Sequence, residues 1–367
     1  MNKRNPFSAI YYMKENKGRC FIGVFMMVLA TLMFLSGNYI QSVIYPFHKE
    51  FEYSNQVVVA GIQPTDEEYK DFAAFKKLVQ EDPKLNYVDV TALGFSGMQH
   101  QTVLNLEMGG WSYVFNSVDD MKKVFNHLGI EGDFSNCKHR SMVISQDFAN
   151  NKGIKLGDKL DETFDSVLDG VYTVDAIIDD GSFCTFYVYE DDENLGRLYI
   201  YSDTMVGKEL YDYVRDLAKD KKVQISETEE ASFMGQIKIF FVLFYLIDIL
   251  IAIVLAVTVN SVITGQYIKR IYEFGVYRAL GRSKWDVKKK VIAEVFVMNA
   301  IACIIGAGIM LTYTYIINEL YYVPKGEYLM FASQTGMVGF MICDLLIVIP
   351  LVLSKGRMMS RADVTAF

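Results

Sequence analysis

The sequence predicts a membrane protein with four transmembrane helices and a large α+β domain, in two lobes, inserted between the first and second helix. Three observations lead to this fold class. Hydrophobic residues make up 51% of the 367 residues, although 22% are still charged. The apolar residues gather in four long stretches, and the charged residues gather between them. Basic residues are concentrated in alternate connections, which gives the stretches an orientation.

Each of the four stretches is long enough to cross a hydrocarbon core, which takes about 20 residues as a helix. We assign the transmembrane helices to residues 20–42, 236–263, 291–317 and 328–354. Buried core helices are the alternative, but four such stretches in one chain are improbable in a soluble fold. The first stretch is longer than the apolar part of a signal peptide, so we expect it to be retained.

The connections carry opposite charges. Lys and Arg outnumber Asp and Glu in an amphipathic N-terminal segment, in the second connection and in the tail, which are residues 1–19, 264–290 and 355–367. By the positive-inside rule these segments, and therefore both termini, are cytoplasmic. The other side receives a large domain, residues 43–235, and a short loop, residues 318–327.

The net charge of −8 combines an acidic outer domain with a basic remainder of the chain. The large outer domain holds 18 Lys and Arg against 35 Asp and Glu, a net charge of −17, which leaves +9 for the rest of the chain. An acidic domain favours solubility and cationic partners. Nucleic acid is not an expected partner, because its phosphates require a basic surface.

The outer domain of 193 residues shows strands and helices without a regular repeat, which is typical of an α+β fold. We expect a strand, an acid-led helix and a second strand at 57–60, 65–80 and 87–90, followed by a hairpin of 102–108 and 111–115 around Gly109-Gly110. Further strands are expected at 172–178, 183–189, 197–201 and 223–225, with a helix over 204–219.

No catalytic or metal site is predicted on this chain. The four histidines have no paired spacing suited to zinc, and no GxSxG nucleophile elbow occurs. The phosphate-binding loop GxxxxGK(S/T) is absent, so the chain cannot hydrolyse ATP by that route. Cys137 and Cys184 are the only cysteines of the outer domain, and a single disulfide between them is left open.

The most informative stretch is residues 266–290, QYIKRIYEFGVYRALGRSKWDVKKK, which continues the second span into the cytoplasm. Its apolar residues recur at helical spacing, and Gly281 is placed to end that helix. The lysines 288–290 suit contact with anionic membrane lipid. Lipid contact does not explain the small residues Gly275 and Ala279, which suit a helix that enters a groove of a partner.

At these residues the chain resembles the FtsX-like, or MacB-type, permeases of ABC transporters, also called type VII. Their second span runs on into a segment of the form E-(I/F)-G-(I/L)-x-(K/R)-A-(L/M)-G-A, which residues 273–281 match, with Arg282 where a small residue is commoner. One span, a large outer domain and three further spans is also the family layout. Ser145 to Ala149, Gly153 and Leu156 to Asp158 are similar to the family's S-x-x-x-A…G…x-G-D segment.

The resemblance implies a non-catalytic permease subunit in the bacterial cytoplasmic membrane. ATP and Mg would bind to a separate cytoplasmic ATPase, and a second permease copy or a paralogue would complete a dimer. Closure of the ATPases would move the inner segment, tilt the second span and displace the outer domain, which is called mechanotransmission. The residues expected to dock on the ATPase are Glu273, Phe274, Gly275, Arg278, Ala279, Leu280 and Gly281.

Three functions fit these observations. The leading one is export of a peptide, an antibiotic or a lipid-like substrate, which the large outer domain favours. Some members of the same family instead regulate extracellular partners such as cell-wall hydrolases. A membrane-anchored receptor or adhesion module is an alternative from another class, but it leaves the motif at 273–281 without a purpose.

Asp248 and Asp344 stand near the middle of their predicted spans, where an ionised carboxylate is costly. Either they belong to a proton relay, or they form hydrogen bonds with polar side chains of neighbouring helices. The second reading is favoured, because no intramembrane Lys or Arg is available as a partner.

Overall fold

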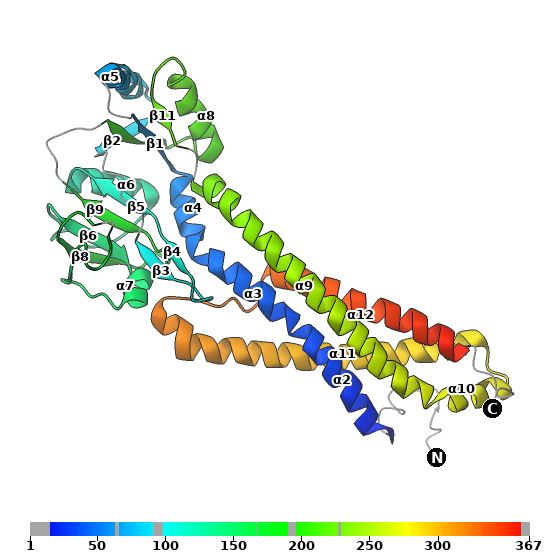
Figure 1. Ribbon diagram of the computed structural model, residues 1–367. Coiled ribbons are helices and arrows are strands. Elements are labelled where there is room, and N and C mark those ends of the chain that lie inside the picture. Colours follow the sequence, from blue (N-terminus) through cyan, green and yellow to red (C-terminus); the bar gives the residue numbers. More distant parts are fainter. Residues whose placement is uncertain are drawn as a thin grey trace. The chain divides into compact units, whose positions relative to one another are not determined.

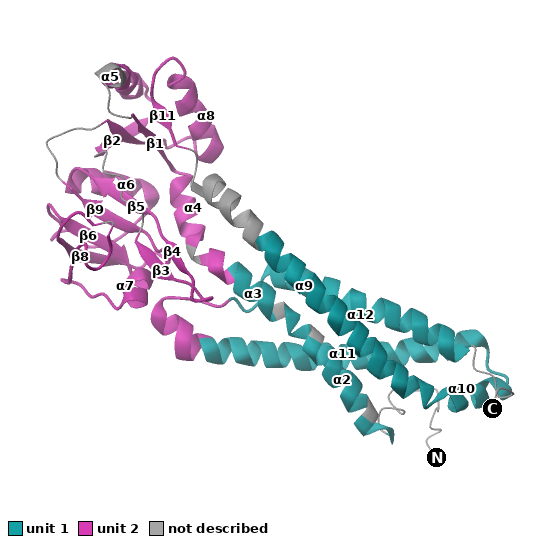
Figure 2. Ribbon diagram, viewed as in Figure 1, with its two compact units in different colours: residues 1–41, 240–317, 330–367 teal, residues 42–239, 318–329 magenta. Residues whose placement is uncertain are grey.

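The computed structural model describes residues 15–62, 66–90, 98–166, 168–189, 196–226 and 229–360 (Figure 1). The chain divides into two compact units (Figure 2). The helical unit comprises residues 1–41, 240–317 and 330–367, and the α+β unit comprises residues 42–239 and 318–329. Most of the predicted N-terminal segment 1–19 and the end of the predicted tail 355–367 lie outside the described residues.

Long apolar helices form the helical unit. The bounds are Lys17–Thr31 for α2, Met33–Ile44 for α3, Glu229–Ile268 for α9, Lys284–Ile317 for α11 and Gln334–Ser360 for α12. Three segments of the described chain are long and apolar enough to cross a membrane: Phe241–Ile268, Lys284–Lys325 and Gln334–Ser360. Large apolar side chains such as Leu250, Val257 and Ile304 are exposed on them, as lipid-facing residues of a membrane protein would be.

The predicted first span, residues 20–42, is not one uninterrupted helix. α2 ends at Thr31 and α3 begins at Met33, with a turn at Leu32 between them. Among the described residues this region does not count as one long apolar helix. The Thr31 hydroxyl donates a hydrogen bond of 2.7 Å to the carbonyl of Val28, and this local bond competes with the helix ladder. The structure therefore confirms three of the four predicted spans as long apolar helices.

Glycine allows close contact between helices of this unit. A side chain on Gly37 of α3 would collide with the backbone of Gly336 in α12, and one on Gly306 of α11 would collide with Thr31. Next to the first contact, Asn38 Oδ1 accepts hydrogen bonds from the amide and the hydroxyl of Ser333, at 2.9 and 2.8 Å. The segment before the α+β unit is thus fixed to the start of α12.

A four-stranded antiparallel sheet forms one part of the α+β unit (Figure 1). Its order is β11-β1-β10-β2, with strands Gln224–Ile225, Val57–Gly61, Arg197–Tyr201 and Asn86–Val90. The helices α5, Asp66–Glu81, and α8, Gly207–Leu217, pack on it through Phe75, Val79 and Leu210. The expected strand-helix-strand unit of β1, α5 and β2 is confirmed, with β10 lying between its two strands.

A five-stranded mixed sheet forms the other part. Its order is β5-β9-β6-β8-β7, with strands Ser112–Phe115, Thr185–Val188, Ser141–Ser145, Tyr172–Ile178 and Lys159–Leu160. The accompanying helices are α6, Val118–Leu128, and α7, Gln146–Lys152, and α4, His48–Ser54, leads into β1.

The predicted hairpin of 102–108 and 111–115 is wrong. β4, Glu107–Gly109, pairs with β3, Gln99–Gln101, whereas β5 pairs in parallel with β9. β5 is the edge strand of the five-stranded sheet, and Tyr113, Val114 and Phe115 are buried there, so this segment packs into the core beside β9 instead of pairing with β4.

The predicted division of this domain into two lobes is not confirmed. One hydrophobic cluster contains Val88 and Tyr199 from the first sheet together with Phe115 and Phe186 from the second. This shared core makes the α+β unit a single compact unit.

The predicted short loop 318–327 also belongs to the α+β unit. It consists of the π-helical turn η2, Asn318–Tyr322, and the 3-10 turn η3, Val323–Lys325. The Tyr322 hydroxyl donates to the carbonyl of Val103 at 2.9 Å, and Asn151 Nδ2 of α7 donates to the carbonyl of Lys325 at 3.1 Å. We refer to residues 318–329 as the strap.

Candidate functional site between α9 and α11

The inner segment folds as a short helix between two sharp turns. α9 ends at Ile268, and α10 spans Ile271–Ala279. Gly281 follows with a φ of +88°, a conformation that favours glycine. Ser283 then begins α11, since its hydroxyl accepts a hydrogen bond of 3.1 Å from the amide of Asp286. The helix and the glycine turn predicted over 266–281 are therefore confirmed, with a break at residues 269–270.

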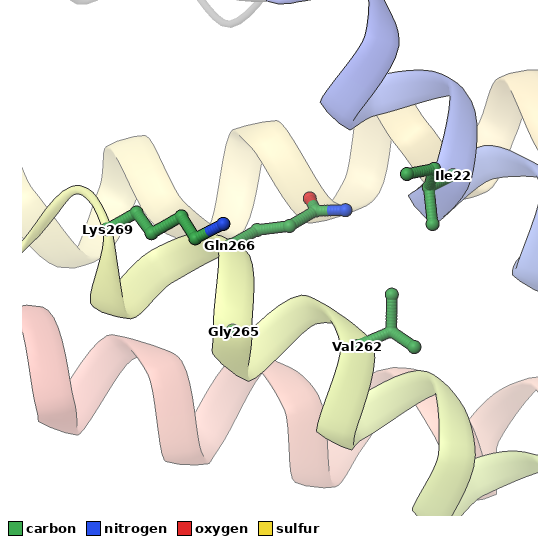
Figure 3. A pocket seen from close by; sticks show the side chains of 5 residues that line it. All are labelled: Ile22, Val262, Gly265, Gln266 and Lys269. Atoms are coloured by element: carbon green, nitrogen blue, oxygen red, sulfur yellow. The ribbon is translucent and has the colours of Figure 1, made fainter.

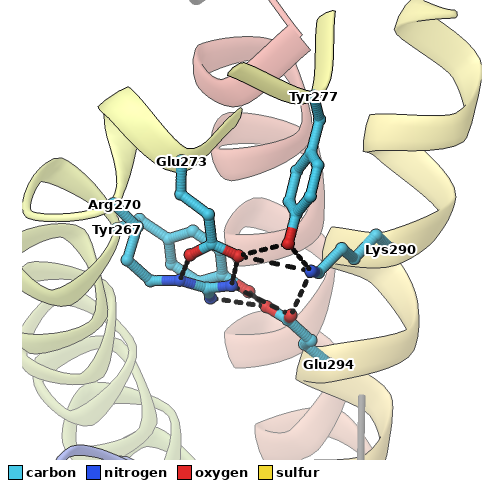
Figure 4. Close-up of polar contacts among 6 residues, drawn as sticks. All are labelled: Tyr267, Arg270, Glu273, Tyr277, Lys290 and Glu294. Atoms are coloured by element: carbon cyan, nitrogen blue, oxygen red, sulfur yellow. Dashed lines mark hydrogen bonds and ion pairs between the residues drawn. The ribbon is translucent and has the colours of Figure 1, made fainter. Parts of the chain in front are cut away.

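Six polar side chains from α9, α10, α11 and the break between α9 and α10 meet in one cluster (Figure 4). We call it the polar cluster, and its members are Tyr267, Arg270, Glu273, Tyr277, Lys290 and Glu294. It contains two cations and two carboxylates, so its charges balance.

Arg270 is the centre of the polar cluster. Its Nη1 and Nη2 donate to the two carboxylate oxygens of Glu294 at 2.7 and 3.1 Å, which is a bidentate pair. Its Nε donates to Glu273 Oε2 at 2.9 Å. Only a guanidinium offers donors in a planar fork that can bind two carboxylates in this way.

Lys290 and the two tyrosines complete the network. Lys290 Nζ donates to Glu273 Oε1 at 3.3 Å and to the Tyr277 hydroxyl at 3.2 Å. The Tyr277 hydroxyl donates to Glu273 Oε1 at 3.2 Å, and the Tyr267 hydroxyl donates to Glu294 Oε2 at 3.1 Å. Because every charge has a partner of opposite sign, the cost of burying these charges is offset.

Burial and neighbouring charges shift the pKa values of Arg270 and Glu273 in opposite directions. Burial alone would lower the pKa of Arg270, but the hydrogen bonds and charges of Glu294 and Glu273 outweigh it and raise that pKa. Burial would likewise raise the pKa of Glu273, but Arg270 and Lys290 hold it below its ordinary value. Both groups therefore stay ionised, and the cluster is held by charge-assisted bonds.

The motif residues predicted to dock on a partner separate into an inner and an outer group. Phe274 is completely buried beneath the Arg270 guanidinium, which lies 4.9 Å from its ring centre, and Gly275 is also buried. Arg278 Nη1 donates to the carbonyl of Ser360 at the end of α12, at 2.8 Å. Glu273 belongs to the polar cluster. These four residues position α10 within the chain, and their docking on an ATPase stays a prediction.

The outer group is the turn itself. Ala279, Leu280 and Gly281 are exposed, and 76% of the Leu280 side chain is accessible. Exposure continues without a break to Trp285, whose ring lies 5.6 Å from Lys289 Nζ. We call residues 279–285 the exposed turn. An apolar side chain at the tip of a rigid turn is suited to a partner's groove.

Arg270, Lys290 and Glu294 were not among the residues predicted to form the site. Glu294 in particular is almost completely buried, with 1% exposed. The sequence did contain a signal, because Arg270 and Glu273 are three residues apart and Lys290 and Glu294 are four apart, spacings at which opposite charges meet on a helix.

The other predicted residues lie away from this site. Ser36 Oγ donates to Asp248 at 3.1 Å, whereas Asp344 is half-buried in α12. Cys137 and Cys184 both contribute to the core shared by the two sheets, and both are free thiols in the structure, so the disulfide left open by the sequence is not formed there.

Comparison with known proteins identifies a family for the helical unit. Residues 242–359 match the model of the FtsX-like permease C-terminal family. No curated protein matches the chain. Among solved structures, the crystal structure of the periplasmic region of MacB from Actinobacillus actinomycetemcomitans matches with 10% sequence identity and a TM-score of 0.27. That match covers 50% of this chain and 94% of the other, and at such a score it has no weight for function.

Proposed function

We propose that this chain is an FtsX-like permease that conveys ATP hydrolysis by a separate cytoplasmic ATPase to its α+β unit. The support from comparison is the match of residues 242–359 to the C-terminal domain of that family. The family consists of ABC-type permeases, which implies an ATPase partner. In this proposal ATP and Mg bind to the partner, and this chain is the non-catalytic subunit. A second copy or a paralogue completes the transporter, which exports a peptide, an antibiotic or a lipid-like molecule.

The polar cluster is the observation that carries the proposal. It joins the end of α9, the whole of α10 and the start of α11 through buried ion pairs, while it leaves the exposed turn accessible. A force applied at the exposed turn would therefore reach α9 and α11 together, because breaking a buried ion pair costs roughly 3–5 kcal/mol. α9 is the helix that begins at Glu229, in the α+β unit, and ends at Ile268.

In this proposal the chain crosses the membrane four times. We include α2 and α3 as the first crossing despite the interruption at Leu32, because together they run from Lys17 to Ile44 and are rich in apolar residues. The excess of Lys and Arg in residues 1–19, in the inner segment and in the tail supports a cytoplasmic position for both termini in a bacterial cell. The α+β unit is then extracytoplasmic.

The test separates docking from folding. Leu280→Asp places a charge on the exposed turn, and Leu156→Asp makes the same change at a 63% exposed position of the α+β unit. The tagged full chain is purified in detergent, and the ATPase activity that co-purifies with it is measured. We expect Leu280→Asp to lower this activity at least tenfold, which corresponds to about 1.4 kcal/mol, and Leu156→Asp to leave it unchanged.

The buried motif residue provides the contrast. Phe274→Ala should destabilise the helical unit by about 3–5 kcal/mol, because it opens a cavity beneath Arg270. Thermal unfolding of the purified chain should therefore shift for Phe274→Ala and not for Leu280→Asp. If Leu280→Asp retains as much ATPase activity as Leu156→Asp, the exposed turn is not the docking surface.

A further inference from the structure

A half-open hollow lies between α2 and α9 in the helical unit (Figure 3). Its lining residues are Ile22 from α2 and Val262, Gly265, Gln266 and Lys269 from the end of α9 and the residue that follows it. Its volume is about 250 Å³, below the roughly 300–1,000 Å³ of pockets that enclose a whole small-molecule ligand. That space accommodates part of a larger molecule rather than a whole one.

The lining is apolar at one end and polar at the other. Figure 3 shows Ile22 facing Val262, and Lys269 extending towards Gln266. The space next to Gly265 is open, because a Cβ added there would meet no atom within 4 Å. A molecule with an apolar chain and a polar, anionic group would match both ends.

The depth of the hollow in the membrane points to the same chemistry. The apolar helix Phe241–Ile268 ends directly before Lys269, and the proposed orientation puts this end at the cytoplasmic side, so we expect the ammonium at the level of the lipid headgroups. The neighbouring cation Arg270 is neutralised by Glu273 and Glu294, whereas Lys269 is exposed. Lys269 is therefore placed to bind the phosphate of a lipid.

We propose that this hollow is a binding site for an anionic phospholipid of the inner leaflet. The phosphate contacts Lys269 and Gln266, and the beginning of one acyl chain lies between Ile22 and Val262. The inference uses the proposed orientation of the helical unit but not the ATPase, so lipid binding measured without ATPase is independent of the coupling proposal.

The experiment uses the purified full chain in phosphatidylcholine vesicles that contain a small fraction of photoactivatable phosphatidylglycerol. After illumination, lipid-modified peptides are quantified by mass spectrometry. We expect labelling at residues 22 and 262–269, and a reduction of about fivefold in Lys269→Gln, the effect of one cation near anionic headgroups. Gly265→Leu should reduce labelling as well, because it fills the hollow while the charge remains.

Two control variants make the result specific. Lys284→Gln removes an exposed lysine of the exposed turn, and Gly308→Leu adds the same side chain at a glycine of α11 that also has no atom within 4 Å of an added Cβ. Both should keep full labelling.

Three outcomes would overturn the proposal. The first is equal labelling in Lys269→Gln, Gly265→Leu and the control variants. The second is equal labelling by photoactivatable phosphatidylcholine at the same positions. The third is unchanged lipid labelling in Gly265→Leu while the same variant no longer forms a dimer in size-exclusion chromatography. That result would mean that a second copy of the chain, and not a lipid, covers the hollow.

Discussion

Asp248 accepts a hydrogen bond from Ser36, which lies on α3, while Asp248 lies within the apolar part of α9. The two residues are 212 positions apart in the chain, so the contact links two helices of the helical unit. A hydroxyl partner satisfies a carboxyl group in an apolar setting without requiring a path for protons. This contact supports the reading of Asp248 as a structural hydrogen-bond acceptor.

Asp248→Asn should therefore be tolerated, because the amide oxygen can still accept from Ser36. Asp248→Ala should destabilise the chain by about 0.5–1.5 kcal/mol, the net contribution of one hydrogen bond, because the Ser36 hydroxyl can still donate to the carbonyl of Met33 at 2.8 Å. Thermal unfolding of both variants in detergent checks this prediction. A transport defect in Asp248→Asn with normal stability would argue for the proton relay instead.

At the scale of residues, the sequence predicted the motif 273–281 but not the structural role of each of its residues. Glu273 and Leu280 belong to the same motif, yet one is held in the polar cluster and the other projects from the exposed turn. Helical spacing indicates which residues share a face, but not which face a neighbouring helix covers. Contacts with α11 and α12 decide that, and both helices come later in the chain.

At the scale of elements, the backbone of the strap packs directly against the backbone of α7. Gly326 has a φ of +67°, and a side chain there would collide with the backbone of Asp147 in α7. Asn318 anchors the ends of the strap to each other, since its side chain donates to the carbonyl of Leu329 and accepts from its amide. A glycine in this position allows the strap to lie directly on α7.

Gly326→Ala should release the strap from α7. The matched control is Gly153→Ala, because Gly153 has a φ of +70° but no atom within 4 Å of an added Cβ. Both variants should lose roughly 1–2 kcal/mol from the left-handed conformation, and only Gly326→Ala adds a collision. Hydrogen exchange should therefore accelerate over residues 318–329 in Gly326→Ala alone. Equal acceleration in both variants would contradict the contact.

The strap should also respond to pH through Glu327. Burial raises the pKa of Glu327 to about 7, although Lys325 and the hydrogen bond from Asn151 act in the opposite direction. Since this pKa is above the value of 4.5 for a free glutamate, the protonated form favours docking. Docking is therefore tightest below pH 4.5 and weakens as the pH rises through about 7.

Protection factors from hydrogen exchange, corrected for the intrinsic pH effect, measure this response over residues 318–329. They should fall between pH 5 and pH 8 in the wild type, and the fall should be smaller in Glu327→Gln. Burial also raises the pKa of Asp147, to about 6, aided by Asp179 and Asp180, so Asp147→Asn should remove a separate, lower step. An identical pH profile in Glu327→Gln and wild type would contradict the assignment to Glu327.

Several elements had readable signals that the predictions did not use. α6 begins at Ser117, whose hydroxyl accepts from the Asp120 amide at 3.1 Å, and it ends at Gly129 with a φ of +69°. α7 has the same design, with Ser145 at its start and Gly153 at its end. These serine starts and glycine ends are local signals. The pairing of β5 with β9 is not local, because it joins residues 112–115 to 185–188.

At the scale of the whole molecule, charge is distributed by segment. The large predicted outer segment carries −17 and the remainder carries +9, and the family match over 242–359 falls within the basic remainder. By the positive-inside rule, such an asymmetry predicts the orientation of the spans.

Cysteine labelling would test this topology directly. Lys219→Cys in the α+β unit and Lys284→Cys in the exposed turn both replace exposed lysines. They are introduced into a chain whose natural cysteines, Cys20, Cys137, Cys184, Cys303 and Cys343, are replaced by alanine. A membrane-impermeant maleimide should label Lys219→Cys in intact spheroplasts and Lys284→Cys only after permeabilisation. Labelling of both in intact spheroplasts would overturn the proposed orientation.

The sequence by itself determined three of the apolar spans, the expected orientation, most strands of the outer domain and the inner motif. These features follow from local composition and spacing, which are properties of neighbouring residues in the chain. Only the tertiary structure decided that Glu294 is buried with Arg270, that one core joins both sheets and that the strap lies on α7. Each of these depends on residues distant in sequence, whose contacts are selected by burial and charge pairing rather than by local pattern.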